Sequence, residues 1–354
     1  MESFEDPAPI LLRHFRGHHG PITCLAYNSN QHSNKLASSS TDKSVNLWNT
    51  EDRIRCFKFS GHSDIVNGVA WSHNGQLMAT ASKDRTIKVW VPTVRGSSCT
   101  FPALSAVRSV EFHPKDRKLV TATDDKAVKL WSIDTKRFAQ SFLGHTNRVN
   151  CARYSPSGKT VASCSDDRTL KLFDVNSGEC VQTFTERGNV HGNDVAWHPN
   201  GGLIAIALSN SQIKIFDIKA RKLIQLYSVH LDGVNSIAFH PSGNLMITAS
   251  EDGSTKVLDL LEGRPIYTLV GHDDAVTAVT FSGDGSNFAT ASKDKQIMLW
   301  SLNMDIINDN DISSAQRSIE NDRNMGNILD TSVMIDPRKT THYKFCPDDY
   351  DIME

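Results

Sequence analysis

The sequence has no long uncharged apolar run and almost no excess of one charge. No stretch approaches the roughly 18 uncharged apolar residues that a membrane span needs, so no contact with a membrane is expected. The 354 residues carry 38 Lys and Arg against 40 Asp and Glu, for a formal net charge of −2. This balance argues against a protein that coats nucleic acid by bulk electrostatics. Residues 1–7 are acidic with no basic stretch before an apolar run, so no secretory signal is expected.

Cysteine pairs and phosphate-binding loops are also missing. The seven cysteines are an odd number and include no C-x-x-C pair, which fits reduced thiols in a cytosolic protein better than a disulfide framework. No Gly-rich loop is followed by a helix and a Lys, so no nucleotide cofactor is expected. The histidines that do not belong to a repeat are dispersed, without the spacing of metal ligands, so no metal is expected either.

What the sequence does contain is a repeat of 41 to 43 residues. Seven short strands with period-2 alternation end at aligned positions: Trp48, Trp90, Trp131, Phe173, Phe216, Leu258 and Trp300. Six residues before each stands an Asp, or Asn210 in the fifth repeat, and eight before stands a Ser or Thr, or Leu208 in the fifth. In five repeats a His lies 22 or 24 residues before the Asp.

This spacing is the signature of WD-repeat propellers, which have four strands in each blade. A buried Trp needs an acceptor for its indole N–H, and a Ser hydroxyl, a His ring and a turn Asp can be linked to supply one. We therefore expect a structural tetrad in each regular blade. The clearest sets are His18, Ser40, Asp42 and Trp48; His62, Ser82, Asp84 and Trp90; and His272, Ser292, Asp294 and Trp300.

The same pattern predicts an all-β, seven-bladed propeller over residues 10–302. A further strand follows the aligned end of the first six blades, but none follows Trp300. The unassigned apolar run at residues 10–15 is therefore expected to supply the missing outer strand and close the ring. Residues 1–9 would be an N-terminal extension, and the Asn- and Asp-rich residues 303–354 a disordered acidic tail.

A Ser, a His and an Asp could instead form a hydrolase triad, with His62 as base, Ser82 as nucleophile and Asp84 as the orienting acid. The same set recurs at the same spacing in other repeats, whereas catalysis needs one site with an oxyanion hole. We therefore expect no catalytic residue and no small-molecule substrate.

Three blades depart from the rule, and one of them, blade six, does so only by ending in Leu258 instead of Trp. Blade three lacks the His, and blade five lacks the whole polar set because it has Leu208, Asn210 and Phe216. Apolar packing could replace the hydrogen bonds without loss, which we favour, or blade five could border a specialised groove.

Charged residues beside the turn Asp suggest a binding surface. Blade seven neighbours blade one in a closed ring, so the cations of blades seven, one and two would lie together on the face that carries the Gly-His loops. This expected basic arc consists of Lys43, Lys83, Arg85, Lys293 and Lys295. It would suit an acidic protein partner.

Residues 240–272 resemble blade six of the "proteome of centriole protein 1" family. The stretch 258–264, LDLLEGR, is the most specific part because it departs from the Trp rule as that family does, and residues 15–18 and 82–86 are similar as well. The resemblance implies a microtubule-associated structural protein of centrioles and basal bodies, located in the centrosome and cilium base and needed for centriole integrity and cilium formation. Its implied partners are centriolar proteins, including acidic tubulin tails. The alternative is a generic WD adaptor, such as a ubiquitin-ligase substrate receptor or an RNA-processing scaffold.

Overall fold

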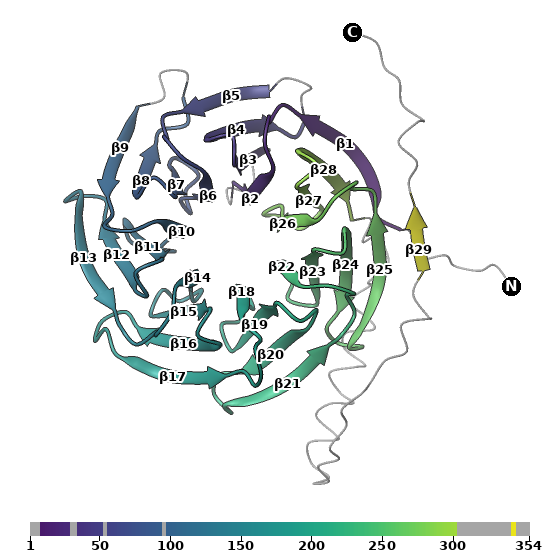
Figure 1. The fold of residues 1–354 in the computed structure, drawn as a ribbon. Helices are drawn as coiled ribbons and strands as arrows, with labels where there is room; N and C mark the ends of the chain where they lie inside the picture. Colours follow the sequence, from purple (N-terminus) through teal and green to yellow (C-terminus); the bar gives the residue numbers. More distant parts are fainter. Residues whose placement is uncertain (1–7, 29–33, 52–54, 94–96, 303–340, 345–354) are drawn as a thin grey trace, which may run out of the picture.

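The computed structural model describes residues 8–28, 34–51, 55–93, 97–302 and 341–344. Their strands form seven sheets arranged as the blades of a ring, as Figure 1 shows in a view down the axis. The prediction of an all-β, seven-bladed propeller is therefore confirmed. Within the described ranges, no helix is long and apolar enough to cross a membrane.

The blades follow the chain in order, each running from an inner to an outer strand. Blade one comprises β2 (Ile22–Tyr27), β3 (Lys35–Ser40), β4 (Ser44–Asn49) and β5 (Arg55–Ser60). Blade two comprises β6 (Val66–Trp71), β7 (Met78–Ser82), β8 (Thr86–Trp90) and β9 (Ser98–Pro102). Blade three comprises β10 (Val107–Phe112), β11 (Lys118–Thr123), β12 (Val128–Ser132) and β13 (Arg137–Phe142).

The second half of the ring repeats this arrangement. Blade four comprises β14 (Val149–Tyr154), β15 (Thr160–Ser165), β16 (Thr169–Asp174) and β17 (Cys180–Thr185). Blade five comprises β18 (Gly192–Trp197), β19 (Leu203–Leu208), β20 (Ile213–Asp217) and β21 (Lys222–Tyr227). Blade six comprises β22 (Val234–Phe239), β23 (Leu245–Ser250), β24 (Ser254–Asp259) and β25 (Arg264–Val270).

Blade seven is assembled from both ends of the described ring. Its inner strands are β26 (Val276–Phe281), β27 (Asn287–Ser292) and β28 (Gln296–Ser301), and its outer strand is β1 (Ile10–Arg16). β1 pairs antiparallel with β28, with Leu11 opposite Trp300 and Phe15 opposite Ile297. The predicted closure of the ring by the N-terminal strand is confirmed.

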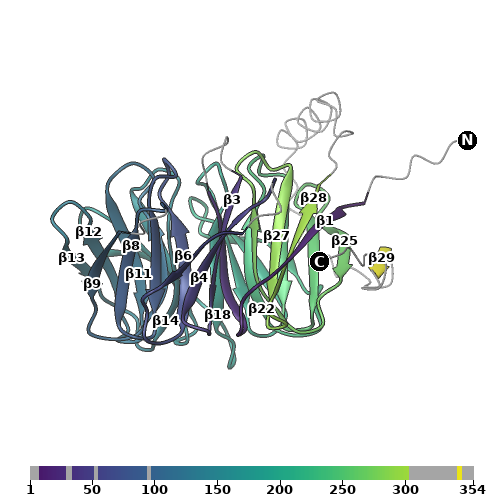
Figure 2. The same cartoon turned by 90° about the horizontal axis from the view of Figure 1, so that it is seen from above.

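The acidic tail departs from its prediction at one place. Residues Thr341–Lys344 form β29, which pairs in parallel with β25 as a fifth strand at the periphery of blade six (Figures 1 and 2). The prediction of disorder is wrong for this segment because the edge of β25 offers unpaired backbone groups that an extended chain can satisfy. The rest of the predicted tail, and residues 1–7 of the predicted extension, lie outside the described residues.

The core consists of seven apolar clusters between neighbouring blades. In one of them Met78 and Trp90 of blade two pack against Leu47 and Phe59 of blade one. Each sheet is therefore buried on both faces, which is why nearly every residue of a second strand such as β7, β11 or β19 is buried. The loops that lead into the inner strands, and the turns between second and third strands, lie on one face of the ring, called the upper face below.

Candidate protein-binding surface

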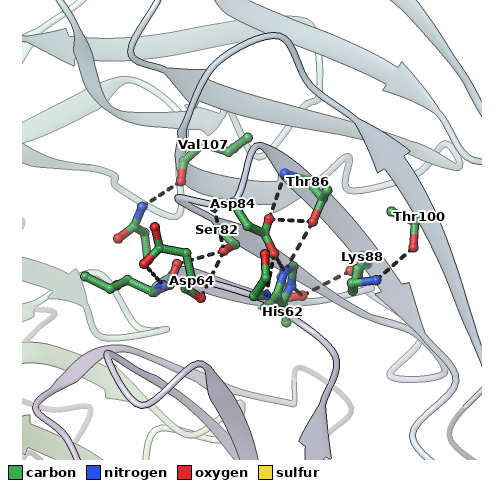
Figure 3. A network of polar contacts seen from close by, with 12 residues as sticks. His62, Asp64, Ser82, Asp84, Thr86, Lys88, Thr100 and Val107 are labelled. Carbon is green, nitrogen blue, oxygen red and sulfur yellow. Dashed lines mark hydrogen bonds and ion pairs between the residues drawn. The ribbon is translucent and has the colours of Figure 1, made fainter.

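Below the upper face of blade two, four side chains are linked by hydrogen bonds, and Figure 3 shows the part of this network around His62 and Asp84. The Nδ1 atom of His62 lies 2.8 Å from Oδ2 of Asp84, and its Nε2 atom lies 2.8 Å from Oγ1 of Thr80. Trp90 donates its indole N–H to the same hydroxyl at 3.0 Å. This chain fixes the loop before β6 and the turn after β7 to the middle of the blade.

The predicted Ser of each tetrad is wrong, because the hydroxyl that links His and Trp lies two residues earlier. It is Ser38 in blade one, Thr80 in blade two and Thr290 in blade seven. These residues share a face of the sheet with the Trp and lie nearer to it along the strand. Ser40, Ser82 and Ser292 instead accept the backbone N–H of Asp42, Asp84 and Asp294 at the turn.

The network also sets the protonation of its members. Burial lowers the pKa of His62 below its usual value, despite the opposing effect of Asp84, so the ring is neutral near pH 7. Burial alone would raise the pKa of Asp84, but hydrogen bonds from Thr86, His62 and the backbone of Ser63 together lower it. The carboxylate is therefore charged and fully engaged inside the protein.

The blades that lack part of the polar set differ in what replaces its hydrogen bonds. In blade three Lys129 replaces the absent His and forms an ion pair with Asp125, while Trp131 still donates to Thr121 at 3.0 Å. The prediction that apolar packing replaces the hydrogen bonds is therefore wrong for blade three. In blade five Leu208 and Phe216 are buried and Asn210 bonds only to Gln212, so apolar packing does replace the chain there. Blade six keeps its His230, Thr248 and Asp252 contacts although Leu258 stands in place of Trp.

The turns above these networks carry the predicted cations. Lys43, Arg85 and Lys295 each follow the turn Asp and have left-handed backbone, with φ of 69°, 64° and 71°. This conformation completes a three-residue hairpin in which the third residue takes positive φ. All three side chains are exposed, as is that of Lys83. Among the described residues none of these four cations has an ion-pair partner.

Lys293 does not belong to the free cations. Its Nζ atom lies 2.7 Å from a carboxylate oxygen of Glu251, at the equivalent turn of blade six. The exposed Asp273 and Asp274 of the loop before β26 lie on the same face of blade seven. The predicted basic arc is therefore flanked by acids at its blade-seven end, and Lys293 is not one of its free cations.

Lys126 of blade three, which lies outside the expected basic arc, has no ion-pair partner among the described residues either. Its neighbour Asp124 does not neutralise it, because Asp124 pairs with Arg108 at 2.5 Å and Asp125 pairs with Lys129. Lys126 is exposed, with φ of 69°, in the same turn position as Lys43 and Arg85. The upper-face cations, as the name is used below, are Lys43, Lys83, Arg85, Lys126 and Lys295.

No group of three or more His, Cys, Asp or Glu side chains within the described ranges could hold a metal ion. The His, Asp and hydroxyl groups that suggested chemistry are enclosed in the repeated networks. The accessible groups of the upper face are therefore exposed charged side chains: the upper-face cations on blades seven, one, two and three, and acids such as Asp273 and Asp274 on blade seven.

Comparison with known proteins accords with the fold. A family model described as "WD domain, G-beta repeat" matches residues 10–49, 54–91, 97–132, 136–174, 221–259 and 263–301. A second, described as "Anaphase-promoting complex subunit 4 WD40 domain", matches residues 186–234. Blade five, which has the fewest signature residues, is thus matched by a different family model from the other six.

Individual relatives match over limited lengths. "Small ribosomal subunit protein RACK1y" of Oryza sativa subsp. japonica is 34% identical over 125 residues, which cover 35% of this chain and 37% of that protein. "Ribosome biogenesis protein WDR12 homolog" of Anopheles gambiae is 26% identical over 162 residues, 39% of this chain and 37% of that protein. "THO complex subunit 3" of Arabidopsis thaliana is 28% identical over 131 residues, 36% and 40% respectively. The chain thus matches about two fifths or less of each of these three relatives.

Proposed function

The chain belongs to the WD-repeat family, and we propose that it is a non-catalytic scaffold whose upper face binds an acidic protein segment. The observation that carries this proposal is the cluster of upper-face cations on adjacent blades. Surface charges of one sign that lack partners attract the opposite charge and raise the rate of encounter. The turn Asp residues beside them stay charged, but their carboxylates accept hydrogen bonds within the blades and form no ion pair with these cations among the described residues.

The setting in which this scaffold works has two candidates. The names of the matched relatives refer to a ribosomal subunit, ribosome biogenesis and the THO complex, which supports a generic WD adaptor in an assembly of that kind. The resemblance of residues 240–272 to blade six of the "proteome of centriole protein 1" family supports a scaffold of centrioles and basal bodies. In that setting the acidic tails of tubulin, or an acidic centriole component, would be the partner.

Charge reversal tests the binding surface. Lys43, Lys83, Arg85 and Lys295 are changed together to Glu, and co-sedimentation with microtubules is measured at low and physiological salt. We expect the variant to keep its melting temperature and lose binding, and we expect wild-type binding to weaken with salt because exposed charges are screened within about 8 Å at physiological ionic strength.

The matched control reverses four exposed cations in turns on the opposite face: Lys115, Lys136, Arg137 and Lys159. If the two variants bind equally well, the upper-face cations are a solvated rim and the partner binds elsewhere.

Fluorescent tagging in dividing ciliated cells separates the two settings. Paired puncta at spindle poles and cilium bases support the centriolar one, whereas a diffuse or nuclear signal rejects it.

A further inference from the structure

The outer strand of blade five exposes more large apolar side chains than any other outer strand in the described part of the chain. On β21, Leu223, Ile224 and Leu226 are 46%, 52% and 45% exposed. β1 has two such residues, β13 and β17 have one each, and β25 has none. The WD repeat does not require three exposed apolar side chains within five residues on an edge strand. Such a cluster is typical of an interaction site.

The strand register shows how these side chains are presented. Leu226 pairs with Lys214 and Leu223 pairs with Phe216, while Ile224 is the extra residue of a β-bulge between them. The ring of Phe216 packs on Phe184 of β17, with centroids 4.4 Å apart. Leu223 thus continues an apolar strip that begins in the core between blades four and five.

Basic residues border this strip. The turn between β20 and β21 carries Lys219, Arg221 and Lys222, all exposed and none in an ion pair with a described residue. The nearby Asp217 uses Oδ1 to accept the backbone N–H of Ala220 at 2.8 Å. We call the six residues Lys219, Arg221, Lys222, Leu223, Ile224 and Leu226 the blade-five edge.

The backbone of β21 is also open to pairing. It is the last strand of its sheet, so one side of its N–H and C=O groups has no strand partner in the described structure. The equivalent strand of the next blade, β25, has accepted a fifth strand there, with Tyr267 to Val270 opposite Thr341 to Lys344. Gln225 and Tyr267 occupy matching positions, because each is the last residue paired before the bulge. The periphery of this ring can therefore accommodate an added strand.

We propose that the blade-five edge binds an extended peptide of a partner protein that carries both acidic and apolar side chains, added as a fifth strand to β21. The acidic groups would pair with the turn cations, the apolar groups would cover Leu223, Ile224 and Leu226, and the backbone would satisfy the open edge. This surface lies on the rim of the ring and is separate from the upper-face cations.

Fluorescence anisotropy with the full-length chain tests the proposal. The probe is a labelled synthetic octapeptide that alternates Asp or Glu with Ile or Leu, and the comparison probe has Lys at the acidic positions. We expect the acidic probe to bind and the Lys probe not to bind. The variant Arg221→Glu/Lys222→Glu and the variant Leu226→Ser should each weaken binding by about tenfold, with unchanged melting temperature.

Blade three supplies the matched control. Its turn carries Lys136 and Arg137, and Lys136 has the same φ of 55° as Arg221, but Ala139 and Ser141 stand in place of Ile224 and Leu226. The variant Lys136→Glu/Arg137→Glu should change affinity by less than about twofold. If it weakens binding as much as the blade-five variants, the attraction is general electrostatics and the proposal is wrong.

Hydrogen exchange of the full-length chain identifies what occupies the edge. Those amides of residues 222–227 that face away from β20 should gain protection when the acidic probe is added. If they are already protected in the free protein and do not change, then the chain's own tail or a second copy covers the edge, and the proposal of a partner peptide fails.

Discussion

The hydroxyl of Thr80 accepts the indole N–H of Trp90 at 3.0 Å, and the same oxygen lies 2.8 Å from His62. One buried atom thus joins β7, β8 and the loop before β6. The loop and the turn that present Lys83 and Arg85 are positioned by this contact, so the stability of the blade and the shape of its upper face depend on the same network.

Removal of the carboxylate from this network should destabilise the fold. Asp84→Ala leaves His62, Thr86 and the backbone N–H of Ser63 without their acceptor, which should reduce the free energy of unfolding by about 1–3 kcal/mol. Asn210→Ala is the control, because Asn210 is exposed and its side chain bonds to the side chain of Gln212 on the surface. Chemical denaturation measures both, and equal losses would show that the networks do not stabilise the blades.

A glycine on the opposite face should be intolerant of a side chain. Gly285 has φ of 79°, and a Cβ atom there would lie 2.2 Å from Nε2 of His240, which contacts the Gly285 carbonyl oxygen at 3.2 Å. Gly201 has φ of 73°, but its nearest neighbour would be Pro156 at 3.8 Å. Gly201→Ala should cost about 1 kcal/mol for its backbone, and Gly285→Ala should cost about 1 kcal/mol or more beyond that for the displaced His. Comparable unfolding free energies for the two variants would contradict this.

Ring closure should depend on the first described strand. Deletion of residues 1–16 removes β1, which leaves the edge of β28 open and exposes Trp300. We expect the truncated chain to aggregate instead of forming a soluble propeller, because the lost strand is part of blade seven. Size-exclusion chromatography of the expressed protein checks this, with deletion of residues 1–7 as the control that retains β1. A soluble monomer with the native melting temperature would contradict it.

Stability should fall on mild acidification. The pKa of His18, His62, His145 and His230 is lowered, mainly by burial, so these groups bind protons more readily in the unfolded chain. Their contribution to the free energy of unfolding is complete above the pKa of about 6.5 that His has in the unfolded chain. It is lost as the pH falls toward the lower pKa of the folded state. The melting temperature at constant ionic strength should therefore decrease from pH 7.5 to pH 5.5, and a flat profile would be inconsistent with neutral buried rings.

Glu111 of the inner strand β10, which lines a cavity with Arg153 and Asp194, should shift the stability in the opposite direction. Burial raises its pKa to about 7, although Arg153 and the backbone N–H of Tyr154 oppose the shift. The unfolded carboxyl loses its proton near pH 4.5, so this group destabilises the fold progressively between pH 4.5 and 7. Glu111→Gln should therefore gain melting temperature relative to wild type as pH rises through this range. A constant difference across the range would show that Glu111 does not titrate there.

Much of the fold was predictable from the sequence because its determinants are local and repeated. The spacing of Trp48, Trp90 and Trp131 and the alternation before them indicate a short strand at the same place in each repeat. The closing strand was predictable for a related reason. One repeat lacked its last strand, and one apolar run, at residues 10–15, had no other place. The tail strand β29 was not predictable from the sequence, since its four residues pair only because β25 presents an open edge.

The site depended on contacts that the sequence does not specify. Glu251 and Lys293 lie at equivalent turns 42 residues apart, and only the ring brings them into an ion pair. Asp124 stands next to Lys126 in the chain but pairs with Arg108 across the sheet, which leaves Lys126 free. The sequence by itself therefore determined which turns carry charge, because hairpin geometry is local. Which charges remain available to a partner was decided by the tertiary structure, because ion pairing depends on distances across neighbouring strands and blades.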